Sequence, residues 1–266
     1  MTEPFLKWAG GKRWLANSNQ LPRPATFERY IEPFLGGAAI FFHLRPEQAI
    51  LSDINSELIE LYCVIRDHPE DLMGLMRTHH DAHSQDYYYE VRASIPEAAI
   101  ERAARTMYLN RTCWNGLYRV NLKGVFNVPI GTKSTVVFDH DDFAGISERL
   151  RAAEIRCCDF EETVSEAQQG DFLFVDPPYT VRHNMNGFIK YNENLFSWND
   201  QIRLRDAVAD AIERGAAVVV TNADHDSVRE LYEDVCDYRS VARASVLASE
   251  TARRGQTTEA LFSANI

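Results

Sequence analysis

The sequence lacks the features that would place the chain in a membrane or outside the cell. No apolar run approaches the ~18–20 residues that a membrane-spanning helix needs. The first residues show no basic segment followed by an apolar one, so no secretory signal is expected. The five cysteines are an odd set without CxxC spacing, which favours reduced thiols and no zinc site. We therefore expect a cytoplasmic protein with no metal and no membrane partner.

Acidic residues are missing from two long segments, although the whole chain has a formal net charge of −11. Neither 4–27 nor 106–138 contains Asp or Glu, and both contain several Lys and Arg. The overall charge argues against a general nucleic-acid binder, whereas two basic segments are candidates for contacts with phosphate groups. At 266 residues the chain has room for one large or two modest domains.

The sequence is organised around residues 170–180, GDFLFVDPPYT. The apolar run 172–175 is typical of a buried strand of a parallel sheet, and the two prolines after Asp176 end it. Open α/β sheets bind ligands at the carboxyl ends of such strands. The Asp176 carboxylate, the Pro177 carbonyl and the Tyr179 ring suit a planar group with an exocyclic amine. A strand followed by an ordinary Pro-Pro turn is the alternative.

Two further segments have the pattern of a nucleotide-binding unit. Residues 29–44 indicate a strand, a glycine turn at Gly36 and a helix, an arrangement in which glycines let a ligand approach the helix N-terminus. A second strand, 48–52, ends at Asp53, which is 17 positions after Gly36 (53 − 36). This is close to the spacing of about 20 at which an acid reaches ribose hydroxyls. Asp53 is alternatively the N-cap of the following helix, with Asn55 among the rival caps.

Residues 5–13 carry a glycine pair between Trp8 and Lys12. The pair allows a tight turn and close backbone approach, while Trp8 offers a flat apolar wall and Lys12 a cation for a carboxylate. An ordinary basic loop is the alternative.

The loop 110–131 combines turn signals with aromatic, basic and amide side chains. Such a loop is suited to reading base edges from a groove, with Arg or Lys on guanine and Asn on adenine. The candidates are Arg111, Asn115, Arg119, Asn121 and Lys123. A solvated loop with a few structural aromatics is the alternative. Before this loop, His79, His80 and His83 have no accompanying Cys or carboxylate pattern, so we expect surface helix histidines rather than metal ligands.

The α/β alternation returns after residue 154. The pattern predicts a long polar loop over 181–194, followed by a helix, a strand, a helix and two final strands. The predicted strands and helices of this part cover 154–158, 172–175, 200–214, 216–221, 225–234 and 237–265.

Together these segments resemble the DNA adenine-N6 methyltransferases of the Dam type over nearly the whole chain. The motifs that carry the resemblance are, in order, FLKWAGGK, EPFLGGAAIFF, SDINSELIELY, NRTCWNGLYRVNLKGVFNVPIG, CDFEE and DPPY. The resemblance implies an α/β fold with a Rossmann-like, S-adenosylmethionine-dependent sheet whose last strand is antiparallel. It also implies a catalytic domain of residues 1–60 and 151–266 and an inserted helical target-recognition domain of residues 61–150.

The resemblance further implies the reaction and its residues. The methyl group of S-adenosylmethionine would pass to N6 of a flipped adenine in double-stranded DNA, in GATC or a related short site. Lys12 would lie near the methionine carboxylate, Asp53 at the ribose, and Asp159 with Phe160 at the cofactor's adenine. Asp176, Pro177 and Tyr179 would hold the target adenine. The full cofactor set is Trp8, Lys12, Glu32, Phe34, Gly36, Asp53, Asp159, Phe160 and Asp176, and Lys7 joins the loop residues as a DNA contact.

Some alternatives stay open at this point. Ala38 stands where the family often has a third glycine, and Val120 and Lys123 replace an aromatic and an Arg that are typical of GATC-specific relatives. Cytosine N4 or RNA adenine as the target, and a catalytically silent DNA-binding module, are the rival functions. We expect a bacterial or phage protein, either solitary or part of a restriction-modification system, and a monomer or weak dimer.

Overall fold

The computed structural model describes residues 4–116, 118–119, 125–182, 196–244 and 256–266. The predictions for Asn121 and Lys123, and for most of the loop 181–194, lie outside the described residues.

Within the described ranges, a seven-stranded sheet has the strand order β3-β2-β1-β4-β5-β7-β6. Strand β1 is parallel to β2 and β4, and β4 is parallel to β5, whereas β7 is antiparallel to both β5 and β6. The Rossmann-like sheet with an antiparallel last strand that the resemblance implied is therefore confirmed. The bounds of the strands are β1 Arg29–Glu32, β2 Ala49–Asp53, β3 Ala153–Cys157, β4 Asp171–Val175, β5 Ala217–Ala223, β6 Asp237–Ala244 and β7 Gln256–Ala264.

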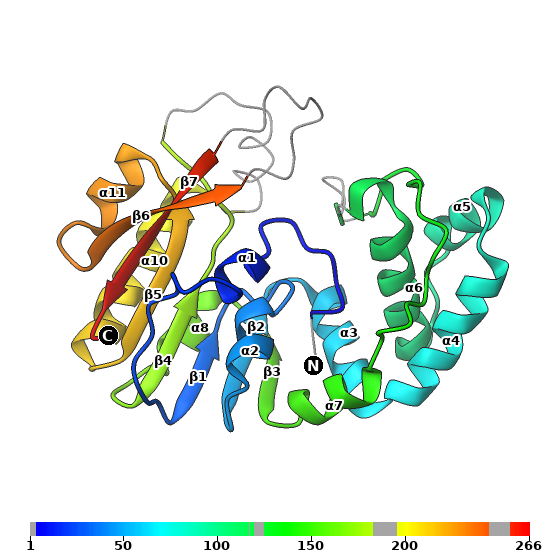
Figure 1. Ribbon diagram of the computed structural model, residues 1–266, viewed down its shortest axis with the longest axis horizontal. Coiled ribbons are helices and arrows are strands. Elements are labelled where there is room, and N and C mark those ends of the chain that lie inside the picture. The colour runs from blue at the N-terminus through cyan, green and yellow to red at the C-terminus, as the bar shows by residue number, and fades with distance from the viewer. Residues whose placement is uncertain (1–3, 117, 120–124, 183–195, 245–255) are drawn as a thin grey trace. The chain divides into compact units, whose positions relative to one another are not determined.

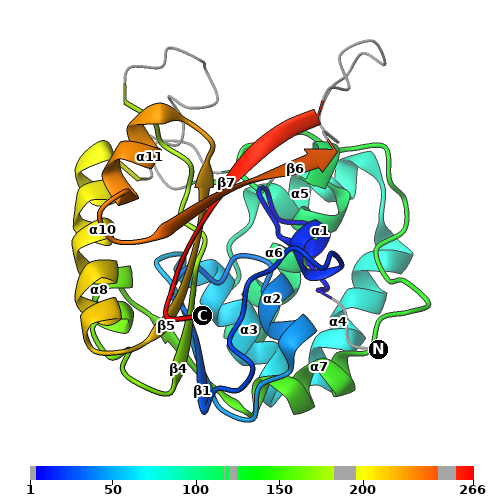
Figure 2. The same ribbon diagram turned by 60° about the vertical axis from the view of Figure 1, so that its left-hand side comes forward.

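The apolar runs of β4 and β5 form strands because both of their faces are covered. Every residue of β4 is buried, and Val218, Val219 and Val220 of β5 are fully buried, as expected for central parallel strands. Helices α8 (Phe160–Val164), α10 (Trp198–Glu213) and α11 (Asp226–Tyr232) lie beside these strands (Figures 1 and 2). Leu204 and Val208 of α10 join the same buried cluster. A capping box between Ser197 and Asp200 starts α10.

The chain forms two compact units. Unit 1 comprises residues 1–13, 35–45 and 53–157, and unit 2 comprises residues 14–34, 46–52 and 158–266. The functional roles predicted for residues 1–60, 61–150 and 151–266 stay predictions.

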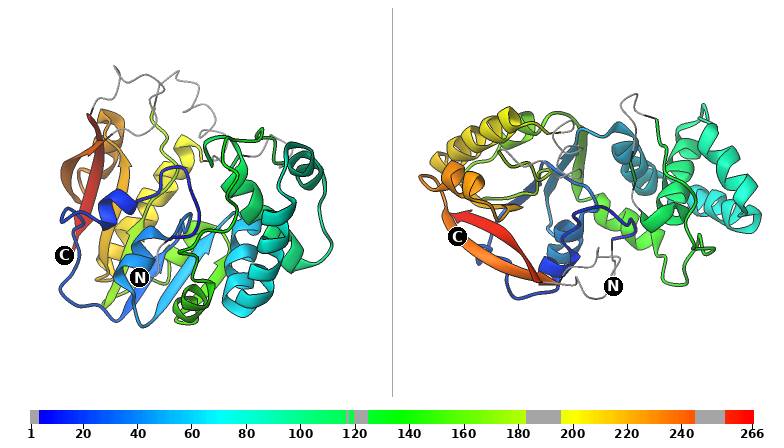
Figure 3. Two further views of the ribbon diagram at one scale, coloured as in Figure 1. Left: turned by 45° about the vertical axis from the view of Figure 1, so that its right-hand side comes forward. Right: turned by 90° about the horizontal axis from the view of Figure 1, so that it is seen from above.

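Unit 1 is mainly helical. Helix α6 is buried at every position from 103 to 112 and packs against α3, α4 and α5; Figure 3 shows these helices, coloured cyan to green, side by side. The helices of unit 1 are α2 Ala39–Leu44, α3 Ser56–Asp67, α4 Pro69–Ala82, α5 Gln85–Ala93, α6 Ala99–Thr112 and α7 Phe143–Leu150, with a 3-10 turn η1 at Trp114–Gly116. The short helix α1 is Arg13–Ala16. None of the helices in the described ranges is both long and apolar enough to cross a membrane.

Of the three histidines expected at surface positions, His80 is exposed, whereas His79 and His83 contact tyrosine side chains. The ring of His79 stacks on Tyr108 at 4.8 Å between centroids, and its Nδ1 lies 2.8 Å from the Tyr87 hydroxyl. His83 Nδ1 lies 2.8 Å from the Tyr108 hydroxyl. Burial lowers the pKa of His79 to about 4, so at neutral pH His79 is an uncharged packing residue between α4 and α6. The helical period was the available signal, because His79 follows the buried Leu72 and Met76 at the spacing of one helix face.

Candidate active site

The turn after β4 holds an acceptor group at the carboxyl end of a central strand. Asp176 is half-buried, and its Oδ1 accepts a hydrogen bond of 2.6 Å from the Thr221 hydroxyl. The parallel register pairs Val175 with Val220. Asp176 and Thr221, which follow these two residues, therefore lie side by side. Pro177 is buried and ends the ladder because it has no N–H to donate. The strand and its stop were predicted; the hydroxyl partner was not.

The hydroxyl of Tyr179, in the same turn, is hydrogen-bonded to a carboxylate. The hydroxyl donates to Oε2 of Glu259 at 2.8 Å, and Glu259 is only 4% exposed. Burial raises the pKa of Tyr179, and the charges of Asp176 and Glu259 raise it further, while a hydrogen bond with Thr221 lowers it. Tyr179 therefore stays a protonated donor at neutral pH, and its hydroxyl is engaged within the protein.

Two buried amides hold the turn from helix α10 and strand β5. Gln201 donates from Nε2 to the Pro178 carbonyl at 3.3 Å, and Asn222 donates from Nδ2 to Oε1 of Gln201 at 3.0 Å. Both amides are fully buried, so each needs these partners to offset its desolvation. Sequence reasoning missed Gln201, Asn222 and Thr221. The one signal available was that Thr221 is the first polar residue after an apolar run.

The other predicted cofactor residues of unit 2 form an aromatic and acidic group. Glu32, at the end of β1, is 3% exposed and accepts a hydrogen bond of 3.0 Å from the Tyr30 hydroxyl. Phe34 follows it and stacks on Phe160 with ring centroids 5.5 Å apart. Phe196 meets both rings at 5.6 Å. The structure thus brings Phe34 and Phe160 together, and the prediction that both contact the cofactor requires this proximity.

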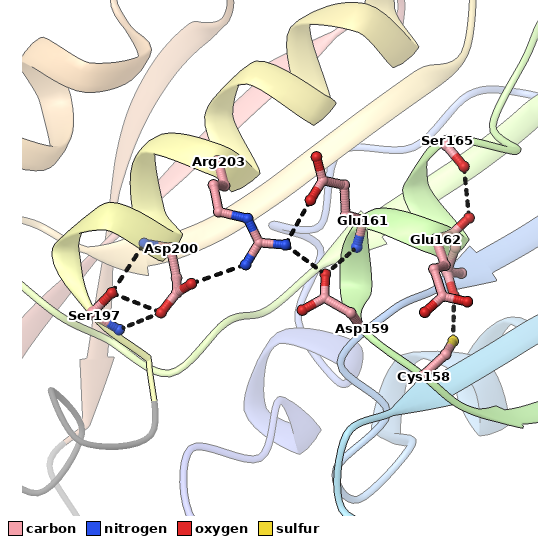
Figure 4. A network of polar contacts seen from close by, with 9 residues as sticks. Cys158, Asp159, Glu161, Glu162, Ser165, Ser197, Asp200 and Arg203 are labelled. Atoms are coloured by element: carbon pink, nitrogen blue, oxygen red, sulfur yellow. Dashed lines mark hydrogen bonds and ion pairs between the residues drawn. The ribbon is translucent and has the colours of Figure 1, made fainter.

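Asp159 begins helix α8 and belongs to a charged network (Figure 4). Its Oδ1 accepts from the backbone N–H of Glu161 at 3.0 Å, which caps the helix. The same oxygen accepts from Arg203 of α10 at 3.0 Å. Arg203 also donates to Glu161 at 2.5 Å and to Asp200 at 3.0 Å, and its guanidinium lies 4.9 Å from the centre of the Phe160 ring. One arginine therefore fixes both residues that were predicted at the cofactor's adenine.

In unit 1, Asp53 is held by backbone amides. Oδ2 accepts from the N–H of Gly36 at 3.1 Å, and Oδ1 accepts from the N–H of Asn55 at 2.9 Å. Asn55 itself caps α3 by accepting from the N–H of Leu58 at 3.2 Å. The alternative interpretation of Asp53 as the helix cap is therefore wrong. Burial raises the pKa of Asp53, while these amide hydrogen bonds lower it.

The close approach of the Trp8 side chain explains why glycines precede α2. A side chain on Gly36, which has φ +47°, would place its Cβ 2.9 Å from Cδ1 of the Trp8 indole, and one on Gly37 would lie 3.3 Å from Trp8 Cβ. The indole also stacks on the Tyr118 ring, with the ring centroids 5.8 Å apart. Ala38 has φ +51°, a left-handed conformation that favours glycine. The glycine turn was predicted from ligand access; in the structure the close approach is made by Trp8.

Lys12 is 3% exposed and donates from Nζ to the Gly10 carbonyl at 2.7 Å. A buried ammonium whose position is fixed by the loop that it follows is suited to binding a carboxylate. No group of three or more His, Cys, Asp or Glu side chains in the described part of the chain is arranged to hold a metal ion. None of the five cysteines, all of which lie in the described ranges, is joined in a disulfide.

Comparison with known proteins identifies these motifs. The family described as D12 class N6 adenine-specific DNA methyltransferase matches residues 8–249. The chain belongs to this family. It is 39% identical over 265 residues to the type II methyltransferase M1.LlaDCHI of Lactococcus lactis subsp. cremoris, covering 96% of this chain and 93% of that protein. It is 35% identical to a DNA adenine methylase of Haemophilus influenzae, covering 86% and 82%, and 30% identical to one of Escherichia coli, covering 86% and 84%.

The protein is therefore a site-specific DNA methyltransferase that modifies adenine N6, and its reaction needs a methyl donor. The rival interpretations of a cytosine or RNA target have no support in these relatives.

Three of the predicted DNA contacts of the methyltransferase share a cavity in unit 1. Lys7, Arg111 and Asn115 all line a cavity of about 640 Å³. The backbone of Lys7 is fixed by Asn110, which accepts from its N–H at 3.1 Å and donates to its carbonyl at 2.8 Å. Burial and the nearby charge of Lys133 lower the pKa of Lys7. The structure brings these residues together; their contact with DNA stays a prediction.

Arg111 does not have the position that a DNA contact requires. Its side chain is 3% exposed and forms a bidentate pair with Asp141 at 2.6 and 2.7 Å. It also donates to the Val136 carbonyl at 2.7 Å and lies over the Phe138 ring. The structure does not support the prediction that Arg111 contacts phosphate, because its guanidinium group is engaged in contacts that anchor the segment 136–143. Arg119, in contrast, is exposed.

Proposed function

We propose that the methyltransferase takes its methyl group from S-adenosylmethionine and delivers it to an adenine extruded from duplex DNA. The single observation that carries this proposal is the turn after β4, where Asp176, two proline carbonyls and Tyr179 stand at the carboxyl end of a buried parallel strand. Within a stacked duplex, N6 is out of reach of such a turn, so the target adenine has to leave the stack at a cost of a few kcal/mol.

The residues of the turn act on the amine of the target. The N6 lone pair is delocalised into the purine ring, and it becomes a nucleophile when the two N–H bonds are held by acceptors. The Asp176 carboxylate and the Pro177 carbonyl are such acceptors, and they favour the positive charge that develops on nitrogen in the transition state. Stacking of the purine on Tyr179 contributes ~1–3 kcal/mol of binding. The proton leaves nitrogen after the methyl group has been transferred.

The donor set fits S-adenosylmethionine. Asp53 offers a carboxylate whose charge is disfavoured by burial, so ribose hydroxyl donors would satisfy it. Lys12 would bind the carboxylate of the methionine moiety, and Trp8, Glu32 and Gly36 belong to the same proposed set. Phe34, Phe160 and Asp159 would hold the adenine of the cofactor. When bound, the cofactor supplies an electrophilic methyl group on a sulfonium; the chain's own residues bind, orient and exclude water.

The experiment is methylation of duplex DNA by the purified protein with radiolabelled S-adenosylmethionine, followed by sequencing of the modified DNA. We expect methyl groups at adenine N6 within one short site, GATC or a related sequence. Methylation of cytosine or RNA, or binding of cofactor without transfer to any DNA, would contradict the proposal. We further expect a monomer or weak dimer in the cytoplasm of a bacterial or phage-infected cell.

Recognition of the flanking bases is proposed to come from the loop 110–131. We expect Lys123 to read a base edge and Arg119 to act in binding generally, either by a phosphate contact or by supporting the loop. A base contact carries ~1–3 kcal/mol of discrimination, whereas a phosphate contact weakens all sequences alike and lowers the salt slope by about one. The Lys123→Ala variant should therefore relax the preference at one flanking base pair, and Arg119→Ala should not.

The measurement is methylation of duplexes with each flanking pair replaced in turn, at two salt concentrations. An equal slowing of every duplex by Lys123→Ala would show a phosphate contact instead.

A further inference from the structure

Two residues of neighbouring antiparallel strands reach the turn after β4 from the same side. Thr221 of β5 donates to Asp176 at 2.6 Å, and Glu259 of β7 accepts from Tyr179 at 2.8 Å. The strand register pairs Thr221 with Leu261 and Ala223 with Glu259. Residues directly opposite each other share a face, and so do residues two apart on one strand. Thr221 and Glu259 are therefore diagonal neighbours on one face of the β5–β7 pair.

Packing alone does not explain Glu259. It is 4% exposed, and the next two residues of β7, Ala260 and Leu261, are at most 1% exposed. A carboxylate is almost never this buried unless it is paired or hydrogen-bonded, because desolvation is costly. The chemistry proposed above uses the Asp176 carboxylate and the ring of Tyr179 and has no step for Glu259. Its contact with the Tyr179 hydroxyl assigns it a different task.

We propose that Glu259 and Thr221 are positioning residues for the methyl-transfer turn. Glu259 fixes the Tyr179 phenol so that the ring presents one face to the target adenine. Thr221 fixes the Asp176 carboxylate so that one oxygen stays directed at N6. The inference rests on the proposed function, since it assigns these residues to the same site.

The inference predicts which kinetic quantity changes. Both hydrogen bonds orient groups that act on the reacting amine, and a misplacement of about 1 Å costs up to ~100-fold in rate. Binding of the rest of the DNA is made elsewhere, so loss of either bond should lower the rate of methyl transfer far more than it raises KM for DNA.

The first experiment is a double-mutant cycle on Glu259 and Tyr179, read as the single-turnover rate of methyl transfer. We expect Glu259→Leu and Tyr179→Phe each to lower the rate by about 10-fold, and the double variant to be no slower than either single one. Glu259→Gln keeps an acceptor oxygen and should stay within roughly 3-fold of the wild type. Effects that multiply in the double variant would overturn the inference, because Glu259 would then act independently of the tyrosine.

The second experiment compares Thr221→Val with Thr221→Ser. Valine has the shape of threonine without the hydroxyl, and serine keeps the hydroxyl without the methyl group. We expect Thr221→Val to lower the single-turnover rate by about 10-fold and Thr221→Ser to restore most of it. Equal loss in both variants would show that only packing matters at this position and would overturn the role of the hydroxyl.

The matched control is Tyr238→Phe. Tyr238 of β6 also donates its hydroxyl to a carboxylate, Asp224, at 2.7 Å, and it has no part in the turn. This variant should keep the wild-type rate, so a loss of rate here would overturn the assignment by showing that any such bond in the sheet matters. Thermal unfolding of each variant identifies one that fails to fold. If Glu259→Leu does not fold, Tyr179→Phe alone decides, and a wild-type rate in that variant overturns the inference.

Failure of the proposed function is distinguishable from failure of this inference. A wild-type protein that transfers no methyl group to adenine in DNA contradicts the proposed function. A wild-type protein that is active, with Glu259→Leu and Thr221→Val equally active, contradicts only the positioning roles.

Discussion

The two aspartates at the ends of parallel strands, Asp53 as the last residue of β2 and Asp176 directly after β4, are held in different ways. Asp53 accepts from two backbone amides, those of Gly36 and Asn55. Asp176 accepts from a side-chain hydroxyl, that of Thr221. Backbone donors depend on the conformation of the loop, so side-chain substitutions elsewhere leave them in place. A hydroxyl partner is a separate residue that substitution can remove. The comparison predicts that the geometry at Asp53 is robust and that the geometry at Asp176 depends on distant residues.

The largest effect is expected at Asp176. The Asp176→Ala variant should lose methyl transfer by at least ~100-fold, about 2.7 kcal/mol, because an acceptor aimed at the developing charge is removed. Affinity for S-adenosylmethionine should fall only modestly. Single-turnover kinetics and calorimetry measure the two quantities. A variant that keeps more than about a tenth of the wild-type rate, ~1.4 kcal/mol of barrier, would refute the assignment.

The control lies at the other end of the same strand. Asp171 begins β4, is 4% exposed and forms a bidentate pair with Arg29 at 2.8 and 3.0 Å. The Asp171→Asn variant should lower the thermal stability and leave the rate of methyl transfer unchanged. The contrast tests whether the carboxyl end of β4 carries the chemistry while its beginning carries stability.

The next effect is expected at Asp53 and Lys12. The Asp53→Ala and Lys12→Ala variants should each weaken S-adenosylmethionine binding by ~1.5–3 kcal/mol, the value of a charge-assisted hydrogen bond. Calorimetry measures it. Burial raises the pKa of Asp53 above that of an aspartate in the unfolded chain. Between these two pKa values the folded state binds more protons than the unfolded state, so the ionisation of Asp53 lowers the stability as the pH rises. Loss of stability in Asp53→Ala should therefore be small.

The Asn55→Ala variant distinguishes a loss of helix capping from a loss of cofactor binding. This variant removes the side chain that caps α3, so it should lower the stability by ~1 kcal/mol and leave cofactor affinity unchanged. Unchanged affinity in Asp53→Ala and Lys12→Ala, with the same loss of stability as in Asn55→Ala, would show that both residues are structural.

The smallest effect is expected at Arg203. Its side chain is 43% exposed, so its ion pairs are screened by solvent. The Arg203→Ala variant should raise KM for S-adenosylmethionine by roughly 3- to 10-fold, because Asp159 and Phe160 lose their common support, and should leave the single-turnover rate unchanged. Arg205→Ala on the same helix is the control, since Arg205 contacts Leu231 and Asp206 instead. Equal effects in both variants would assign the loss to helix α10 as a whole.

Much of the fold was predicted from patterns that extend over only a few residues. The apolar run before Asp176 and the two prolines after it defined the end of β4, and the segment 225–234 and the two final strands were also predicted from short patterns. The outcome differed where a residue's partner is distant in the sequence. Arg111 looked like a phosphate contact because no acid is near it in the sequence, yet Asp141, 30 positions away, neutralises it in the core.

The sequence by itself determined where Asp53 and Asp176 stand, because chain reversal by glycine and ladder termination by proline act over a few residues. Only the tertiary structure decided what holds them. The Thr221 hydroxyl is 45 positions from Asp176, and Glu259 is 80 positions from Tyr179. Both contacts depend on the register of β5 with β4 and with β7. A register is fixed by the packing of whole strands, and shifting it by one residue would turn every side chain to the opposite face of the sheet.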